Sequence, residues 1–475
     1  MYLNNNLFST MIYFLVFLYI GSMVMPLVGP INDSLIHFSS TSSEIRDHFG
    51  GMDPGSFATG GWTIFKDGWF DWKTVWLINL WPPGLMILEG VILKLFGEAA
   101  PLAGILQVIA ALILAIAWNL FRLCLELFLS RKIAISLTLV ILAFPQFRIF
   151  MLGADAVLLG GTFAISFLLS GFFLLILSYA RRSFKLAIFS GVCFALSAYF
   201  RSQFETFFMV ATINICLVAL IFYVYNKIYF RYFKLNVSND FKLINPFLII
   251  ILSIITFHAL TIPYRLYTHS RMQSYKWVQT EDIIWQHNFT SSNDLDKNSG
   301  GFVRVGGGNL ACIIDSDKCK QIKSKLDNHT ITSPDLRKSV ILTFLQNPVT
   351  WIKLKFQILP KYWFITINSF GALSRVDNIS SLLENMFFLG CILFTLLYSF
   401  ITLKNPYSLI NYWMSSSLCI AYSIIFIFAH FEVRYFFVLK FYFAVAAMLC
   451  FAQIISRLSS FKSTVVVNSE LPDAI

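Results

Sequence analysis

The sequence has little charge. Asp, Glu, Lys and Arg together make up 13% of the 475 residues, about half of their share in a typical globular chain. Hydrophobic residues make up 57%, and 50 of them are phenylalanines. This composition excludes an ordinary soluble protein, because so much apolar surface has to be covered by lipid. We therefore expect an integral membrane protein that crosses the bilayer several times.

Several motifs of soluble enzymes are also missing. The glycine-rich run at 299–309 lacks the following Lys-Ser or Lys-Thr of a phosphate-binding loop. The sequence has no Gly-x-Ser-x-Gly elbow of a serine hydrolase, and its cysteine spacing does not fit a four-ligand zinc site. The chain has 36 Lys and Arg against 25 Asp and Glu. In a membrane protein this surplus collects in cytoplasmic loops, so it predicts no nucleic-acid partner.

Apolar stretches predict an all-α polytopic fold of about ten transmembrane helices, each roughly 17–25 residues long. They lie near 8–28, 101–121, 133–152, 156–178, 184–200, 203–225, 246–264, 385–403, 408–429 and 435–456. The apolar run 84–96 is short and carries Glu89 and Lys94. We therefore expect it to form a juxtamembrane or re-entrant helix on the outer side.

The charges of the short connections predict the orientation. Basic residues follow the even-numbered spans: Arg122, Arg131, Lys132, Arg181, Arg182, Lys185, Lys227, Arg231, Lys234, Lys242, Lys404, Arg457 and Lys462. The positive-inside rule assigns that side to the cytoplasm, together with both termini. The acidic segment 29–83 then lies on the outer side. With no retention signal in the sequence, a bacterial inner membrane is the expected location.

This orientation divides the chain into three parts. Residues 1–264 form an N-terminal membrane half whose first outer loop, 29–100, is the expected catalytic loop. Residues 265–384 form a small mixed α/β outer, or periplasmic, domain, in which the amphipathic stretch Val349 to Asn368 is expected to lie in the membrane interface. Residues 385–475 form the last transmembrane helices and a cytoplasmic tail.

Two cysteines share the outer domain. Cys312 and Cys319 bracket the run IIDSDK, so a disulfide between them is expected in an oxidising compartment. Two free thiols are the alternative. The other six cysteines lie in or beside the spans, where cysteine behaves as a small hydrophobe.

Ionisable residues gather at the outer ends of the predicted spans, where they are costly and indicate function. They are Asp53, Asp155, Arg201, Glu205, His430, Glu432 and Arg434. Carboxylates and guanidinium groups on one membrane face suit a reaction that deprotonates an acceptor and holds a phosphate.

Each of these residues also has a structural interpretation. Asp155 has the position of a helix N-cap, and Asp53 that of an Asx turn. Glu432 and Arg434 can form a local interface pair, and Arg201 can snorkel to the membrane surface. An arginine on the outer side opposes the inside bias, which favours a functional role for Arg201.

A series of motifs follows Asp53. The first outer loop contains, in order, Asp53-Pro54, Gly60, Gly68-Trp69, Trp81-Pro82-Pro83-Gly84 and Leu95-Phe96-Gly97. Later come Asp155 in GADAVLLG, Arg201 in GVCFALSAYFRSQFE and Arg434-Tyr435 in FEVRYFFVLKFYF. Together these motifs resemble the GT-C superfamily of glycosyltransferases, most of all the branch of protein O-mannosyltransferases and lipid A aminoarabinose transferases. The chain departs from that pattern in lacking a second carboxylate beside Asp53 and the prolines that often follow the Arg-Tyr pair.

The resemblance implies that a sugar passes from a polyprenyl-phosphate donor to an acceptor on the non-cytoplasmic face, with inversion. Asp53 would take the acceptor proton, since an aspartate is ordinarily ionised at neutral pH. Arg201 and Arg434 would neutralise the phosphate of the leaving lipid. Asp155 would orient the acceptor or join Asp53 in holding Mg²⁺ or Mn²⁺, although no dense ligand cluster in the sequence demands a metal.

Other residues would contact the substrate. His430, Glu432 and Tyr435 lie beside Arg434 in the sequence, and Trp62 and Trp81 lie in the first outer loop. The tryptophan rings can stack on a sugar, and an interfacial aromatic belt explains them equally well. The expected partners are a polyprenyl-phosphate-linked sugar, the lipid bilayer and an acceptor that is a glycan, a lipid or a protein.

Two other functions stay open at the level of sequence. A polytopic transporter or lipid flippase predicts charges buried at mid-membrane and two pseudo-symmetric halves, whereas here the ionisable residues are placed at one face and no internal repeat is evident. A non-catalytic membrane subunit would leave Asp53 dispensable.

Overall fold

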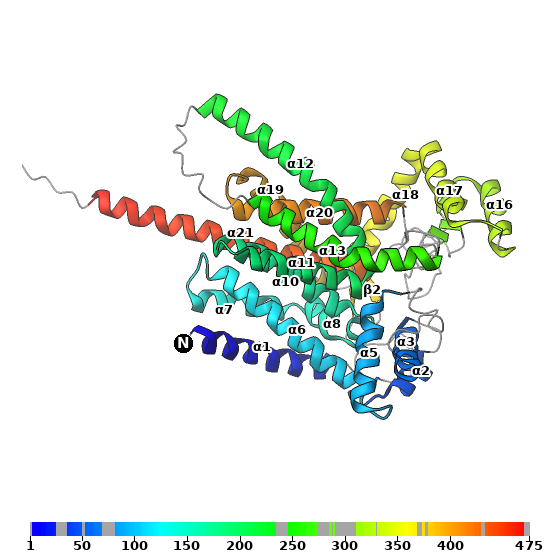
Figure 1. Cartoon of the computed structure of the whole chain (residues 1–475). Coiled ribbons are helices and arrows are strands. Elements are labelled where there is room, and N and C mark those ends of the chain that lie inside the picture. Colours follow the sequence, from blue (N-terminus) through cyan, green and yellow to red (C-terminus); the bar gives the residue numbers. More distant parts are fainter. Residues whose placement is uncertain are drawn as a thin grey trace, which may run out of the picture.

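Figure 1 shows a computed structural model of the protein. It describes residues 2–24, 36–49, 53–68, 81–233, 246–272, 285–286, 288–289, 310–328, 330–367, 373–375, 379–428 and 433–469. The helices are α1 (Tyr2–Val24), α2 (Ser42–Phe49), α3 (Asp53–Asp67), α5 (Pro83–Phe96), α6 (Leu102–Leu125), α7 (Arg131–Val140), η2 (Ile141–Ala143), α8 (Pro145–Leu152), α9 (Ala154–Leu158), α10 (Gly161–Ala180), α11 (Phe184–Phe200), α12 (Ser202–Phe233), α13 (Pro246–Met272), α15 (Leu310–Ile314), α16 (Ser316–Asp327), α17 (Ser333–Gln346), α18 (Pro348–Trp363), α19 (Ile379–Ile401), α20 (Pro406–Phe428) and α21 (Val433–Ser469). Two short strands, β1 (Ile365–Ile367) and β2 (Leu373–Arg375), complete the described elements.

The protein is an integral, multi-pass membrane protein. Within the described residues, eight helices are long and apolar enough to cross a bilayer: α1, α6, α10, α12, α13, α19, α20 and α21. A sharply bent pair, Arg131–Ala143 with Pro145–Leu158, makes a ninth if it is counted as one span. The prediction of about ten full spans is therefore too high. The expected third span is broken before Pro145, whose ring cannot continue the helix, and α11 is only 17 residues long.

The bundle has a packed interior and an apolar outer surface. Trp118, Phe121 and Phe147 are fully buried, and α10 packs between α6 and α11. By contrast, the outward faces of α1, α12 and α19 expose large aliphatic side chains, such as Ile213 on α12 with 75% of its surface accessible. Exposed apolar surface along whole helices is what a bilayer covers.

Several helices that connect the membrane helices lie at one end of the bundle, which we call the loop end. Figure 1 shows α2, α3 and α5 there, together with α16, α17 and α18. Helix α5 runs across this end, in agreement with the prediction of a juxtamembrane helix, and it is preceded by Pro82 and followed by Gly97 in a left-handed conformation. The start of α1 and the end of α21 lie at the opposite end.

The described part of the segment 265–384 is mainly helical. It comprises the end of α13, the helices α15 to α18 and a hairpin in which Ile365–Ile367 pairs antiparallel with Leu373–Arg375. The prediction of a mixed α/β domain is wrong for these residues, because the two-stranded hairpin is the only β-structure among them. Within the amphipathic stretch Val349 to Asn368, helix α18 ends at Trp363 and strand β1 follows it; the expected place of this stretch in the membrane interface stays a prediction.

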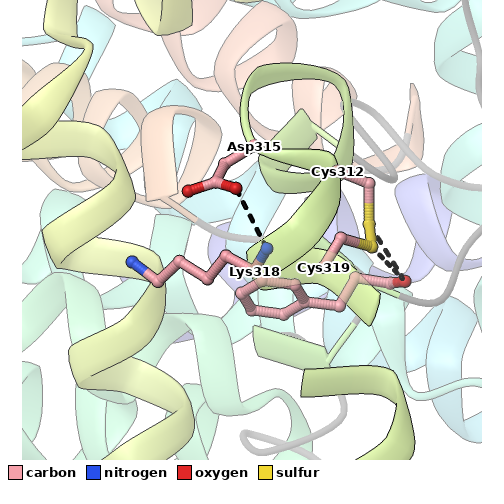
Figure 2. The surroundings of a disulfide bond; sticks show 5 residues. Cys312, Asp315, Lys318 and Cys319 are labelled. Atoms are coloured by element: carbon pink, nitrogen blue, oxygen red, sulfur yellow. Dashed lines mark hydrogen bonds between the residues drawn. A yellow bond between two sulfur atoms is a disulfide. The ribbon is translucent and has the colours of Figure 1, made fainter. Parts of the chain in front are cut away.

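The predicted disulfide is present. Cys312 on α15 and Cys319 on α16 are bonded, with their α-carbons 4.8 Å apart (Figure 2). Between them Asp315 caps α16, accepting a hydrogen bond of 3.0 Å from the Lys318 main-chain nitrogen. Both sulfur atoms lie near the carbonyl oxygen of Phe289, at 3.4 and 3.9 Å. The bond thus holds two short helices together over a chain segment that is distant in sequence.

Candidate functional site

Asp53, Asp155 and Arg201 belong to segments that meet at the loop end. Helix α3 begins with Asp53 and contacts α9, which contains Asp155. Helix α5 contacts both α3 and α11, and α11 ends next to Arg201. Motifs that are far apart in the sequence are therefore neighbours in the fold.

Asp53 is the first residue of α3. Its side chain is half-buried and takes part in interactions with its surroundings. A carboxylate at this position is stabilised by the positive end of the helix dipole. The helix itself is held tightly: a β-carbon on Gly60 would lie 2.2 Å from the sulfur of Met86 on α5, so only glycine permits this approach of α3 to α5. The glycine at this position in the motif thus fixes the helix on which Asp53 lies.

Arg201 lies between α11 and α12 and points toward the start of α10. Its guanidinium Nη2 would lie 3.9 Å from a β-carbon built on Gly161. The preceding Gly160 has a positive φ of 72° and would place a β-carbon 3.3 Å from the carbonyl oxygen of Phe200. The paired glycines after Asp155 therefore make room for the chain at Phe200 and Arg201. The structure brings together the GADAVLLGG and AYFRSQFE segments, which the sequence only placed on the same face.

Asp155 lies in the first turn of α9, which starts at Ala154. The residue therefore follows the helix start and does not occupy the cap position that the sequence offered as an alternative. Its side chain lies outside the described part of the structure, so its role stays a prediction.

The α20–α21 turn is described in part. Arg434 and Tyr435 lie in the first turn of α21, but their side chains fall outside the described part of the structure. His430 and Glu432 lie in 429–432, outside the described residues altogether. The substrate contacts predicted for these four residues remain predictions.

The two tryptophans of the first outer loop have different surroundings. Two cations contact the ring of Trp62: the Arg46 guanidinium lies 4.7 Å from the ring centroid and the Lys66 ammonium 5.7 Å from it. Trp81 packs against Phe57 of α3, with 5.6 Å between ring centroids, and its buried Nε1 has no hydrogen-bond partner among the described residues. The ring of Trp62 is thus in contact with cations, whereas the substrate contact predicted for Trp81 stays a prediction.

The structure shows an ion pair that the sequence did not predict. Glu205 on α12, expected beside Arg201, binds Arg265 on α13. The Arg265 guanidinium also lies 3.2 Å from the sulfur of Met209. The available signal was the one used for Arg201, an arginine at the outer end of a span. Arg265 was not singled out because the span predicted at 246–264 ends one residue before it.

Glu89 on α5 is a second unpredicted feature of the site. Its side chain is only 1% exposed and packs against Gly61 of α3, and its Oε2 has no hydrogen-bond partner among the described residues. Burial raises the pKa of Glu89 well above the ordinary value of 4.5, since desolvation penalises the carboxylate. Burial therefore favours the neutral form of Glu89, whose side chain extends from α5 toward the helix that begins with Asp53.

No set of three or more His, Cys, Asp or Glu side chains in the described ranges is arranged to hold a metal ion. The metal hypothesis needs both Asp53 and Asp155, and the side chain of Asp155 is outside those ranges. The described residues thus supply at most one of the two predicted carboxylate ligands.

No protein-family model matches the sequence, and no curated protein matches it. Similar solved structures include the apo oligosaccharyltransferase of Archaeoglobus fulgidus, with a TM-score of 0.48 and 14% identity over 98% of this chain and 52% of that chain. A second is the archaeal oligosaccharyltransferase AglB of Archaeoglobus fulgidus in complex with an inhibitory peptide and a dolichol-phosphate. Its TM-score is 0.44 and its sequence identity is 13%, over 98% of this chain and 52% of that chain. A third is ArnT of Cupriavidus metallidurans bound to undecaprenyl phosphate, with a TM-score of 0.33 and 13% identity over 94% of this chain and 77% of that chain.

The chain spans about half the length of the oligosaccharyltransferases that it matches. The three structures belong to the kind of glycosyltransferase that the sequence motifs resemble. Because all three TM-scores are below 0.5, the residues at the loop end, and not these similarities, have to support a function.

Proposed function

We propose that the protein is a membrane glycosyltransferase of the GT-C kind, which moves a sugar from a polyprenyl-phosphate donor to an acceptor. The observation that carries the proposal is the meeting of α3, α5, α9 and the α11–α12 junction at the loop end. These elements carry a carboxylate, Asp53, and a guanidinium group, Arg201, at one end of the bundle. The two groups match the two charge requirements of the reaction: a proton is removed from the acceptor, and negative charge develops on the leaving phosphate.

In the proposed reaction Asp53 takes the proton from the acceptor hydroxyl or amine. The acceptor atom forms a bond to the anomeric carbon of the sugar while the bond from that carbon to the phosphate oxygen breaks on the opposite face, so the configuration inverts. The electron pair of the broken bond goes to the phosphate oxygen. Arg201 and Arg434 neutralise this charge through charge-assisted hydrogen bonds. No step is assigned to a metal ion.

The donor is amphipathic, and the loop end suits it. The lipid tail of a polyprenyl phosphate requires apolar surface, which the membrane helices provide, and the phosphate requires cations at the edge of that surface. Asp155 would orient the acceptor, and Trp81 with its unpartnered indole N–H would contact the sugar. The acceptor class, whether glycan, lipid or protein, is left to the experiment.

We place the loop end on the non-cytoplasmic side, in a bacterial inner membrane. The start of α1 and the end of α21 lie at the opposite end of the bundle, in keeping with two cytoplasmic termini (Figure 1). The disulfide between Cys312 and Cys319 lies in the segment assigned to the outer, oxidising compartment.

The test is sugar transfer from a panel of radiolabelled polyprenyl-phosphate sugars built on undecaprenyl and dolichol phosphate, the lipids bound in two of the similar structures. Wild type is compared with Asp53→Asn in matched membranes. The amide keeps the shape of the side chain and removes the base, so we expect transfer to fall by at least about a hundredfold. Asp67→Asn, at the exposed other end of the same helix, is the matched control and should transfer normally.

Equal transfer by wild type and Asp53→Asn would remove Asp53 from the chemistry and leave Asp155 or Glu432 as the candidate base. If the folded wild-type protein transfers sugar from no donor in the panel, the glycosyltransferase proposal fails. Uptake or lipid-flipping assays on the same membranes would then test the transporter or flippase alternative.

A further inference from the structure

A buried lysine connects four helices near the loop end. Lys440, in the second turn of α21, has no exposed surface. Its ammonium donates hydrogen bonds to the Trp363 carbonyl oxygen at 2.9 Å, to Gln146 Oε1 at 3.2 Å and to the side-chain oxygen of Asn385. These acceptors belong to the end of α18, to α8 and to α19. An ammonium group has three hydrogens, so the three bonds satisfy it completely.

A carboxylate completes the cluster. Gln146 donates from Nε2 to Glu384 Oε2 on α19 at 3.1 Å, so one amide bridges the lysine and the glutamate. Arg148 on α8 also acts electrostatically on Glu384. The ammonium of Lys440 further lies 5.0 Å from the ring centroid of Trp363 and 4.8 Å from that of Phe437. The lysine is therefore enclosed by acceptors and aromatic rings, with no surface left for a substrate.

A charged residue in a membrane helix is costly, and a buried ion pair is often no more stable than well-packed apolar residues. A contribution to the stability of the bundle therefore does not by itself explain why a lysine occupies position 440. A network with several directional bonds can instead fix how its elements sit relative to one another.

One of the four connected helices carries a candidate site residue, and another leads into the helix that carries a second one. Helix α8 leads through Gly153 directly into α9 and Asp155. Helix α21 begins at Val433, with Arg434 in its first turn and Lys440 six positions after that arginine. The end of α18 joins them, and it is held in turn by the Trp363 Nε1, which donates to the Asn385 carbonyl at 3.2 Å.

The outer segment also holds the end of α20, just before the α20–α21 turn. Trp351 on α18 is fully buried, and its Nε1 donates to the Ile427 carbonyl oxygen at 2.8 Å. Asn288 donates to the carbonyl oxygen of Phe428 at 3.2 Å. The end of α20 is thus held by the Trp351 and Asn288 bonds, and α21 is held by the Lys440 cluster.

We propose that Lys440 is a positioning residue for the glycosyl transfer: it holds α8 and α21 together so that the Asp155 segment and Arg434 keep the spacing that the donor phosphate and the acceptor require. The inference rests on the proposed function. Lys440 does not touch the substrate and acts through the helices that it joins.

The test compares Lys440→Met, the double variant Lys440→Met/Glu384→Gln and a matched control. Lys440→Met leaves Glu384 without its buried cation and should lower the melting temperature. Neutralising Glu384 in the double variant removes this imbalance and should restore most of the melting temperature. The bonds to Trp363 and Asn385 stay lost, so we expect the KM for a polyprenyl-phosphate sugar to remain raised by about tenfold or more in both variants, because small misplacements of reacting groups have large effects.

The control is Gln453→Met, which removes a buried polar group from the same helix. Gln453 accepts from Asn405 Nδ2 at 3.1 Å and from Ser408 Oγ at 3.3 Å, near the end of the bundle opposite the site. This variant should lose stability while keeping the wild-type KM. Recovery of both melting temperature and KM in the double variant would show that Lys440 only balances charge, and would overturn the proposal.

Hydrogen exchange of the main-chain amides gives a readout that needs no substrate. In the double variant, exchange should increase in peptides covering 145–152 and 379–390, and it should not change there in Gln453→Met. Unchanged exchange would overturn the positioning role even in a protein that transfers sugar. If exchange increases in the double variant but the wild-type protein transfers no sugar, Lys440 still positions the helices, and it is the proposed function that fails.

Discussion

Gly84 lies directly against the carbonyl oxygen of Tyr199. A β-carbon on Gly84 would be only 2.7 Å from that oxygen, at the point where α5 crosses the end of α11. Arg201 follows two residues later. The glycine that ends the Trp-Pro-Pro-Gly motif is therefore needed for contact between the first outer loop and the segment carrying the candidate phosphate ligand.

Gly84→Ala is expected to disturb this contact. The added methyl group has to displace main-chain atoms, which costs about 1–3 kcal/mol in a well-packed site, and the displacement moves the end of α11. We expect a lower melting temperature and weaker sugar transfer. Gly390→Ala is the matched control, because a β-carbon there meets no atom within 4 Å. Equal behaviour of the two variants would show that the close approach at Gly84 has no consequence.

Arg201→Gln tests the cation assigned to the leaving phosphate. Loss of one group that stabilises developing charge lowers the turnover rate by about a hundredfold or more, and we expect a loss of that size in kcat with polyprenyl-phosphate donors. Arg181→Gln, at the other end of the helix pair α10 and α11, should transfer as wild type does. A normal kcat in Arg201→Gln would leave Arg201 with the snorkelling role that the sequence also allowed.

Glu89 should make stability depend on pH. Its pKa is raised in the folded protein, so the folded state keeps a proton that the unfolded chain loses above pH 4.5. The stability linked to Glu89 is therefore fully present below pH 4.5 and decreases as the pH rises toward the folded pKa. Glu89→Met removes the titrating group at similar volume. We expect it to raise the melting temperature at pH 8 more than at pH 5.

Parallel melting curves of wild type and Glu89→Met at several pH values, recorded in one detergent, would measure this difference. Glu98→Gln, an exposed acid just beyond the end of α5 that pairs with Lys66, serves as the control. An equal gain at pH 5 and pH 8 for Glu89→Met would mean that Glu89 is ionised in the folded protein or that its pKa is not shifted.

Reduction of the disulfide should loosen α15 and α16. A bond that closes a loop with a sequence separation of 7 residues is worth about 2–3 kcal/mol by the loop-entropy estimate. In Cys312→Ser/Cys319→Ser we expect faster trypsin cleavage within α16, which exposes lysines at 320, 323 and 325. Cys216→Ser, at an exposed free cysteine of α12, controls for the loss of a cysteine. Unchanged cleavage would contradict a stabilising role for the bond.

The sequence predicted the features that local patterns encode. Long apolar runs located α6, α10 and α20, because burial in lipid requires them. The charge pattern placed Asp53 and Arg201 at the same end of the bundle, and the spacing of Cys312 and Cys319 predicted their bond. The structure shows that two glycines of the motifs, Gly60 and Gly84, lie at close approaches between helices, which the sequence did not predict.

Contacts between distant segments could not be predicted in this way. The acceptors of Lys440 lie 294, 77 and 55 residues away in the sequence, and no pattern around the lysine identifies them. The pairing of Glu205 with Arg265 likewise depends on how α12 and α13 sit side by side. The break before Pro145 was not predicted because most of 133–152 is apolar, and hydrophobicity alone does not report helix bending.

The burial of Trp351 and Trp363 has a practical consequence for the outer segment. Trp351, Lys355 and Trp363 are almost completely covered, and the Lys355 ammonium lies 5.2 Å from the ring centroid of Phe426 on α20. A fragment covering 265–384, cut from the membrane helices, would expose all three side chains to water and lose the carbonyl acceptors of both indoles. Such a fragment would be prone to aggregation. Antibodies raised against it would recognise surfaces that are buried, and so inaccessible, in the intact protein.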